Sequence, residues 1–158
     1  MAVEFKDYSV KVKKLLEDKA LQLLNEGAIE IKAQASKNTK SKKGTGELKK
    51  SWGYAINKSD LEAKIGSPLE HAIYQELGTG EWALNNNGRK PPWYVPIGNG
   101  NNQMPLEVAK KYGFKIVHGK NGMEFAEVHG QRPERTLYKA FETCKNKIIR
   151  RAKTIFGG

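Results

Sequence analysis

The sequence predicts an α+β protein, because two segments with helical apolar spacing enclose several short segments with strand and turn signals. The first helix is predicted from about residue 3 to residue 35, and the second from about residue 134 to residue 156. Between them, polar turns separate short runs of β-branched and aromatic residues, which indicates hairpins. A chain of 158 residues can bury one core, so we expect a single domain over residues 1–158.

The N-terminal segment has apolar residues three and four positions apart, which predicts a long amphipathic helix with one buried face. That face consists of Phe5, Tyr8, Val12, Leu15, Leu16, Leu23, Leu24 and Ile31. The pattern stops at "SKNTKSKKGTG", so we expect residues 36–46 to form a basic, flexible loop.

After this loop, Thr45 is placed to cap a short helical turn through "GELKKS". The next two segments, "WGYAIN" and "LEAKIG", flank the polar turn "KSD". They are predicted to form a hairpin.

The stretch "GSPLEHAIYQELGTG" is predicted to contain a short, partly buried helix over residues 68–77. Ser67 suits its cap and Pro68 its first turn, because proline has no N–H to leave unsatisfied there. Ala72, Ile73 and Leu77 are expected to be its buried residues, and the glycines that follow should end it.

A catalytic interpretation of this stretch would begin with His71 beside Glu70 and Glu76. Acid–base chemistry needs the two groups within hydrogen-bond reach. On a helix, neighbouring positions diverge by about 100°, and positions five apart do not share a face. The geometry therefore argues against catalysis, and we expect no enzyme.

Residues 81–105, "EWALNNNGRKPPWYVPIGNGNNQMP", are predicted to be a long irregular loop rich in Asn, Gly and Pro. Connections this long are usually functional or disordered. Its aromatic residues Trp82, Trp93 and Tyr94 are candidates for a protein interface. The alternative, given equal weight, is that Trp93 pins the loop onto the domain.

The C-terminal part begins with a predicted hairpin around the tight turn "GKNG" and continues into the last helix. One stripe of this helix is apolar, with Leu137, Phe141, Cys144, Ile148 and Ile155. The opposite side should present a basic ridge, which we define as Arg135, Lys139, Arg150 and Lys153. Cys144 is expected in the core rather than as a nucleophile.

The formal net charge of +11 is concentrated in two stretches, residues 36–50 and residues 132–153. Such clusters attract nucleic acid, acidic protein surfaces or anionic membranes, so charge alone does not select a partner, and each could also be a solubilising face. The basic residues proposed to make contacts are Lys40, Lys42, Lys43, Lys49 and Lys50, together with the ridge.

Several classes of function have no support in the sequence. One cysteine and three scattered histidines offer no metal-ligand spacing, and no glycine-rich segment has the spacing of a phosphate-binding loop, so we expect no cofactor and no metal. No apolar run is long enough to cross a membrane, and the first residues lack the apolar run of a secretory signal. We therefore expect a soluble protein made in the cytoplasm, without a membrane partner.

Three segments together resemble a known family, the small tail-component proteins placed at the head–tail junction of long-tailed bacteriophages. These segments are "TGELKKSW" (45–52), "IGSPLEHAIYQELGTG" (65–80) and "QRPERTLYKAF" (131–141). In the family they look like a "TG-x-L-x-x-S" motif, a "VG-x-x-x-x-Y-A-x-x-x-E-x-GT" centre and an "RPF-L-x-x-A" start of the final helix. Two positions depart from the pattern: His71 stands where the family has an aromatic residue, and Glu134 where it has phenylalanine.

The resemblance implies a small antiparallel sheet packed with a long N-terminal helix and a C-terminal helix, and no catalysis. It also implies a virion protein at the head–tail junction or tail, a homo-oligomeric ring that joins the tail to the DNA-filled head. The expected neighbours are head–tail connector and tail-tube or tail-terminator proteins, with non-specific contact to phage DNA as a further possibility. The alternative function is a non-specific nucleic-acid-binding protein that acts through the two basic stretches.

Overall fold

The computed structural model describes residues 7–40 and 46–157, which divide into two compact units. The first unit contains the described residues up to Leu69 and those from Thr136 onward. The second unit contains Glu70–Arg135. The expectation of a single domain stays a prediction, and each unit is described by itself.

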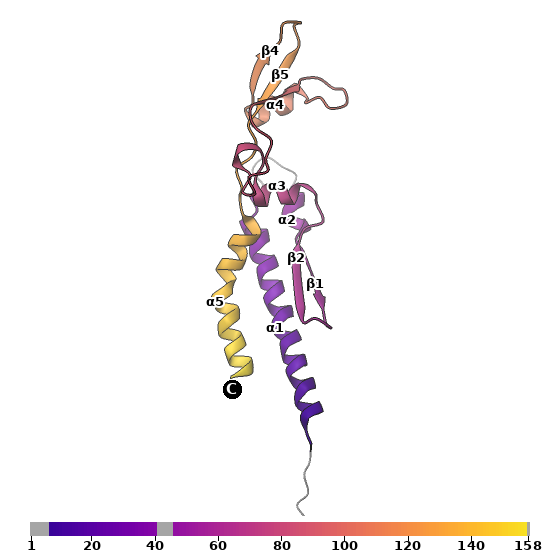
Figure 1. Ribbon diagram of the computed structural model, residues 1–158, viewed down its shortest axis with the longest axis vertical. Coiled ribbons are helices and arrows are strands. Elements are labelled where there is room, and N and C mark those ends of the chain that lie inside the picture. Colours follow the sequence, from indigo (N-terminus) through magenta and orange to yellow (C-terminus); the bar gives the residue numbers. More distant parts are fainter. Residues whose placement is uncertain (1–6, 41–45, 158) are drawn as a thin grey trace, which may run out of the picture. The chain divides into compact units, whose positions relative to one another are not determined.

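The first unit is built on two helices from opposite ends of the chain, α1 (Ser9–Asn38) and α5 (Thr136–Phe156). A short helix, α2 (Glu47–Ser51), follows α1, and a hairpin of β1 (Gly53–Asn57) and β2 (Glu62–Gly66) follows α2. Both α5 and the antiparallel hairpin pack along α1 (Figure 1). Their buried faces form the core of this unit.

Small side chains let α1 and α5 approach closely. Ala28 and Ala35 of α1 and Ala140 and Cys144 of α5 are all buried. A Cβ atom at Gly27 would lie 3.4 Å from the Ile148 side chain, so even the smallest addition there would be in contact. Small residues on both helices therefore set the distance between α1 and α5. Larger side chains at these positions would disturb the packing.

Ion pairs line the edge of the same interface. Lys147 Nζ lies 2.6 Å from Glu30 Oε1, and Arg151 Nη1 lies 3.2 Å from Glu26 Oε2 and 3.8 Å from Glu30 Oε2. The partners come from α1 and α5, and they are partly exposed, so each pair contributes modestly to stability.

The end of α1 is held by Trp52, which is 4% exposed. Its indole Nε1 donates a hydrogen bond to Thr39 Oγ1 at 2.8 Å, and that hydroxyl donates to the Ala35 carbonyl at 2.8 Å. A buried indole N–H needs such a partner. The bond fastens the start of the hairpin to the last turn of α1.

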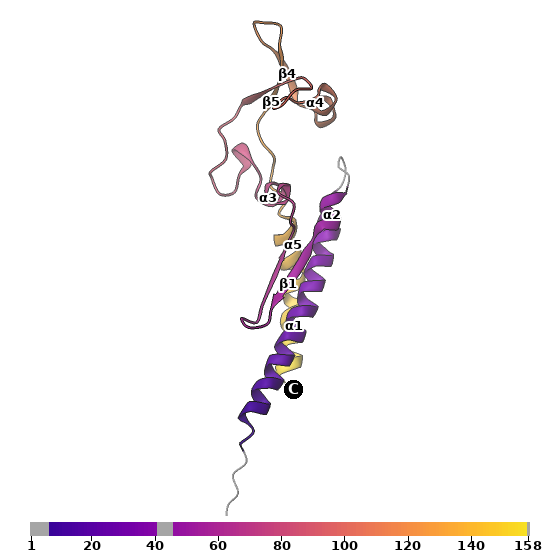
Figure 2. The same ribbon diagram turned by 90° about the vertical axis from the view of Figure 1, so that its right-hand side faces the viewer.

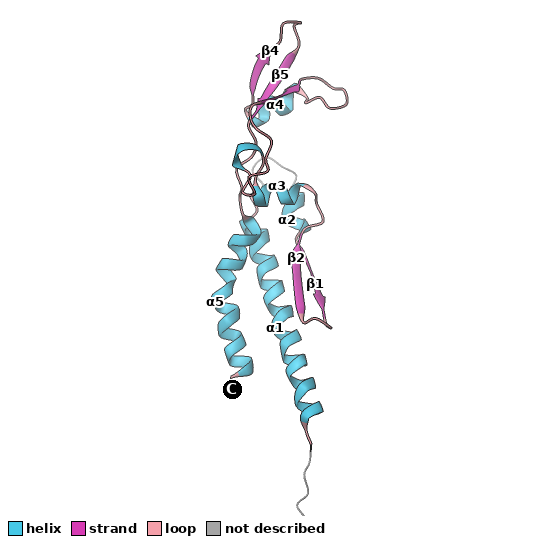
Figure 3. Ribbon diagram, in the orientation of Figure 1, coloured by secondary structure: helices cyan, strands magenta, loops and turns pink. Residues whose placement is uncertain are grey.

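The second unit contains a three-stranded antiparallel sheet in the order β3–β5–β4 (Figure 3). The strands are β3 (Trp93–Pro96), β4 (Lys115–His118) and β5 (Glu124–Val128). This unit also contains α3 (His71–Leu77), the 3-10 helix η1 (Gly80–Trp82) and α4 (Leu106–Tyr112). Ala109 of α4 and Ala126 of β5 are fully buried and mark its core.

The α+β class, the long first helix and the C-terminal helix are confirmed, and both predicted hairpins are present. The strands form two small sheets. Residues 81–105 are less irregular than predicted, because β3 lies within them and pairs with β5. A strand of four residues between Pro and Gly clusters gives too little alternation to be recognised.

Boundaries of the helices also differ. α1 continues to Asn38, so the predicted loop of residues 36–46 begins three residues too early. The short helix α3 begins at His71, not at Pro68. Ser67 is therefore not its cap, although its hydroxyl accepts the Leu69 N–H at 3.2 Å. Phe5 and the predicted cap Thr45 lie outside the described residues.

The predicted burial is partly wrong on three apolar faces, those of α1, α3 and α5. On α1, Tyr8, Val12, Leu15 and Leu16 are 49–56% exposed, whereas Ile31 is buried as predicted. The periodic pattern correctly identified an apolar face but could not show that its first turns stay exposed among the described residues. Elsewhere, Ile73 of α3 and Phe141 of α5 are exposed instead of buried, whereas Ala72 and Cys144 are buried as predicted.

The substitution Trp52→Phe should lower the free energy of unfolding by about 1–3 kcal/mol, because it removes the indole N–H from a buried hydrogen bond. Urea denaturation followed by circular dichroism measures this loss. A double-mutant cycle with Thr39→Val should give a coupling free energy of about 0.5–1.5 kcal/mol. Fully additive effects of the two substitutions would contradict the assigned bond.

Candidate functional site

The central motif ends in a backbone clasp between residues 78–81 and residues 129–131. The Thr79 N–H donates to the Gln131 carbonyl at 2.9 Å, and the Gln131 N–H donates to Thr79 Oγ1 at 2.9 Å. The Glu81 N–H donates to the His129 carbonyl at 3.3 Å. The two segments thereby lie side by side, although about fifty residues separate them in the sequence.

Glycine is required where the two segments of the clasp meet. Gly80 has φ +62° and Gly130 has φ +111°, both in the region that favours glycine. A Cβ at Gly80 would collide with the His129 carbonyl oxygen, and one at Gly130 would collide with the Thr79 carbonyl oxygen. The "GTG" sequence is therefore a structural requirement for close backbone contact.

The clasp also explains why two of the motif segments occur together. Besides the Thr79–Gln131 bonds, the Glu134 N–H donates to the Gln75 carbonyl of α3 at 2.7 Å. The segment 65–80 is thus connected to the segment 131–141 by main-chain hydrogen bonds. In the first unit, Ser51 Oγ and Ser67 Oγ are hydrogen-bonded at 2.7 Å, which connects the segment 45–52 to the central one.

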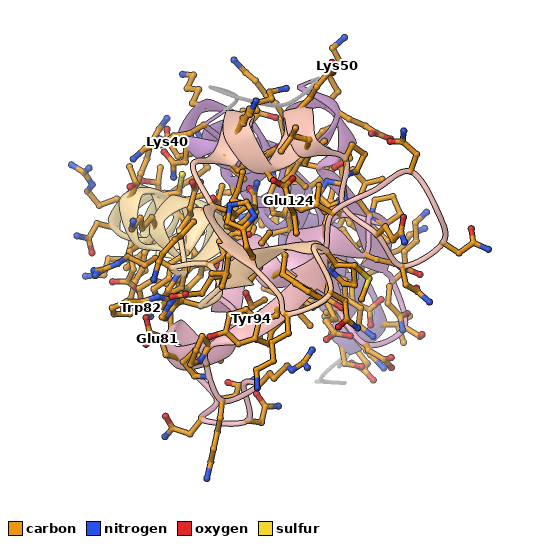
Figure 4. All side chains as sticks on the ribbon, turned by 90° about the horizontal axis from the view of Figure 1, so that it is seen from above. Lys40, Lys50, Glu81, Trp82, Tyr94 and Glu124 are labelled. Carbon is orange, nitrogen blue, oxygen red and sulfur yellow. The ribbon has the colours of Figure 1, made fainter. Side chains whose placement is uncertain are left out.

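The three aromatic residues proposed for an interface have different surroundings. Trp82 is half-buried, and the Arg132 guanidinium lies 3.8 Å from the centre of its ring. Trp93 is half-buried in β3, with the Arg89 guanidinium 5.4 Å from its ring centre. Both contacts are cation–π interactions that hold their loop segments in place. Figure 4 shows Trp82 next to Glu81 at the surface of its segment.

Tyr94 is 51% exposed, and it points to the opposite sheet face from Trp93, because successive strand residues alternate. The two residues therefore cannot belong to one contact patch on this sheet. In the register of the strands, Tyr94 is opposite Glu127, which is itself opposite Lys115. This row presents an exposed aromatic ring next to charged residues.

Glu127 is the centre of that row. Its carboxylate lies 3.0 Å from His129 Nε2 and 3.2 Å from Lys115 Nζ. The hydrogen bond with His129, and after it the one with Lys115, lowers the pKa of Glu127 below its ordinary value. The sequence pattern did not indicate this group, because His129 lies just after the end of β5 and Lys115 comes from the neighbouring strand β4.

Of the basic residues after α1, Lys40, Lys49 and Lys50 are exposed, whereas Lys42 and Lys43 lie outside the described residues. Figure 4 shows Lys50 extending away from the ribbon. On α5, Lys139, Arg150 and Lys153 are exposed along one face, as the helical spacing predicts. Arg135 does not belong to this helix: it precedes α5, has φ +52° and is half-buried.

Several basic side chains near the C-terminus are paired with glutamates, so less positive charge is available for a partner than the net charge of that stretch indicates. Lys147 and Arg151 are paired with glutamates of α1, and Lys145 Nζ lies 3.9 Å from Glu142 Oε1. Without Arg135, which precedes the helix, the ridge consists of Lys139, Arg150 and Lys153, which we call the α5 ridge.

The residues considered for chemistry are dispersed. His71 is exposed at the start of α3, and Cys144 is buried, which raises the pKa of its thiol and disfavours the reactive thiolate. Across residues 7–40 and 46–157, no three His, Cys, Asp or Glu side chains gather as metal ligands. Within the same ranges, no helix has both the length and the apolar content needed to cross a membrane.

Replacing Gly80 with alanine should lower the free energy of unfolding by more than about 2 kcal/mol, because the new Cβ collides with the backbone of the clasp. Gly113→Ala is the matched control: this glycine also has a positive φ, +73°, but a Cβ there meets nothing within 4 Å. The free energy of unfolding of this control should fall by only about 1 kcal/mol, because of backbone strain. Equal losses in the two variants, measured by urea denaturation, would contradict the clasp.

Replacing His129 with alanine should raise the pKa of Glu127 toward its ordinary value, and Lys115→Met should raise it less. NMR titration of the side-chain carboxyl carbon measures both. Because the folded state holds this pKa low, the carboxylate stabilises the fold above the unfolded-state pKa, and that contribution is lost as pH falls through the lowered value. An unchanged Glu127 pKa in His129→Ala would contradict the assigned interaction.

Comparison with known proteins gives one match. The model of the HK97-gp10-like family, described as "Bacteriophage HK97-gp10, putative tail-component", matches residues 4–78. No curated protein and no solved structure matches the chain. The matched region spans α1, α2, the β1–β2 hairpin and α3, and it includes the motif segment 45–52 and residues 65–78 of the central segment. Over residues 4–78, just under half of the chain, the protein is therefore similar to a bacteriophage tail-component family.

Proposed function

We propose that this protein is a ring-forming adaptor at the phage head–tail interface, which joins the tail to the DNA-filled head without catalysis. The observation that carries the proposal is the match of residues 4–78 to a phage tail component. Its neighbours would be copies of itself, head–tail connector proteins and tail-tube or tail-terminator proteins. It would be made in the cytoplasm of the bacterial host and reside in the virion.

Two surfaces support an assembly role. A subunit of a ring needs two different patches, because head-to-tail contacts between copies use different surfaces on each side. The exposed Tyr94 next to Glu127 and Lys115 is one candidate, in agreement with the enrichment of tyrosine at interfaces. Trp82 and Trp93 would act indirectly, by fixing the loop segments that they hold through Arg132 and Arg89.

The α5 ridge is a candidate for contact with acidic partners or with DNA that passes through the junction. Lys139, Arg150 and Lys153 are exposed on one face. Lys40, Lys49 and Lys50 offer further exposed charge near the end of α1. Long-range attraction from such clusters guides acidic partners during encounter.

The same exposed lysines and arginine favour the second candidate, a non-specific nucleic-acid-binding protein. Such binding releases counterions and weakens steeply as salt rises. Fluorescence anisotropy with duplex DNA from low salt to about 0.15 M separates the two functions. Tight binding that persists at the higher salt favours the nucleic-acid function, and weak or absent binding favours assembly.

Phage particles made without this protein should show separate heads and tails by electron microscopy. The triple variant Lys139→Glu, Arg150→Glu and Lys153→Glu should reduce joining at least about tenfold, because it reverses the charge that faces the partner. Circular dichroism should show the variant folded, since all three side chains are exposed. Infectious yield and particle images measure the effect.

The matched control reverses the same number of charges elsewhere, with Lys58→Glu, Lys110→Glu and Lys111→Glu, which are also exposed. This control should join heads to tails normally. Normal joining by the ridge variant would show that the α5 ridge is only a solvated face. Infectious particles in the absence of the protein would overturn the adaptor function itself.

A further inference from the structure

The first turns of α1 present an apolar face that stays exposed among the described residues of the first unit. Figures 1 and 2 show α1 extending beyond the turn of the β1–β2 hairpin and beyond the end of α5. A groove of about 650 Å³ follows this face, with Val12 and Leu16 of α1 on its floor and Leu61 and Phe156 at its margin. All four side chains are 39–52% exposed.

Few charged residues line this groove, and they lie in one row along the helix. Only Lys13 and Glu17 among its lining residues are charged, and their side chains lie 4.0 Å apart along the helix. At about 100° per residue, Lys11, Lys14 and Asp18 point away from the groove. The face therefore has an apolar row, Val12 and Leu16, beside a charged row, Lys13 and Glu17.

We propose that this face of α1 pairs with the same face of a second copy of the chain, with the two helices antiparallel. The lining positions of α1, from Ser9 to Ala20, are symmetric about the point between Lys14 and Leu15. A two-fold axis through that point places Val12 within about 1.5 Å of the height of Leu16 of the second copy. The same axis brings Lys13 to within about 1.5 Å of Glu17 of the second copy, measured along the helix.

The apolar row and the charged row of one copy both match their counterparts on the second copy under this single two-fold rotation. A two-fold axis keeps the apolar row of one copy against the apolar row of the other, and the charged row against the charged row. Each lysine then faces a glutamate across the interface, so opposite charges meet twice. The small residues Ser9 and Ala20 are at the two ends of this face, between the apolar row and the charged row around the helix, and they leave room for a neighbouring helix there.

This pairing goes beyond the proposed adaptor function and does not depend on it. An isologous contact uses the same patch on both copies and closes as a dimer. It can therefore be tested on the purified full-length chain without phage particles.

Sedimentation equilibrium of the full chain should show a monomer–dimer equilibrium below roughly millimolar concentration. The double variant Val12→Glu and Leu16→Glu should weaken the dimer at least about tenfold, because it buries unpaired charge. Ile29→Glu is the control on the same helix: Ile29 is 47% exposed and lies on the side of α1 opposite the groove. The control should dimerise like the wild type.

Charge reversal tests the two-fold arrangement itself. Lys13→Glu alone and Glu17→Lys alone should each weaken the homodimer, since like charges then meet across the axis. An equimolar mixture of these two variants should form a heterodimer, and the double variant K13E/E17K should regain the homodimer. Circular dichroism of each variant confirms that the monomer remains folded, as the exposure of both side chains leads one to expect.

A wild-type chain that stays monomeric at millimolar concentration would overturn the proposal. So would a dimer that tolerates Val12→Glu and Leu16→Glu, or one that the mixture of charge-reversed variants fails to restore. A monomer whose groove variants nevertheless block head–tail joining would assign the groove to another virion protein. Dimerisation lost in the groove variants and regained by the paired reversals would establish the interface, whatever the outcome of the particle experiments.

Discussion

Close packing of α5 against α1 is the interaction on which the first unit depends. The hairpin and α2 follow α1 in the chain, but α5 comes from the other end, and its contact buries Ala28, Ala35, Ala140 and Cys144. The glutamates of α1 that pair with Lys147 and Arg151 fix the position of α5 along the small buried residues of α1. The family match ends at residue 78, well before α5 begins, so the matched elements bury their shared face with a helix that lies outside the matched region. The core of the first unit is therefore completed only when α5, near the other end of the sequence, has been made.

The motif that first suggested chemistry has a structural explanation. In "HAIYQELGTG", the glycines and Thr79 make the backbone contacts of the clasp. Glycine is selected here by sterics and threonine by a hydrogen bond to a main-chain N–H. A short motif can thus mark a family through backbone geometry without indicating any reaction. In the second unit, the exposed side chain of Tyr94 lies apart from this motif, on β3.

Local signals in the sequence predicted local structure well. The turns "KSD" and "GKNG" correctly located both hairpins, and the three-and-four spacing located α1 and α5 within a few residues. Strand β3 was missed because its pairing with β5 depends on residues about thirty positions away. The same limit applies to the contact surfaces. Spacing placed Lys139, Arg150 and Lys153 on one face, but it could not show that Lys147 and Arg151 are neutralised by α1, or that Glu127 lies between His129 and Lys115.

The exposed first turns of α1 bear on how an adaptor could be regulated before assembly. An apolar row next to the alternating charges Lys13 and Glu17 is costly to leave in water, and a second copy offers a complementary surface at the same concentration as the protein itself. A two-fold pair occupies one patch per copy and cannot extend into a ring, whereas a ring requires two different patches on every copy. The two kinds of contact must therefore use different surfaces. The pairing face on the first turns of α1 includes Phe156 of α5, whereas neither Tyr94 nor the three residues of the α5 ridge are among the residues that line it.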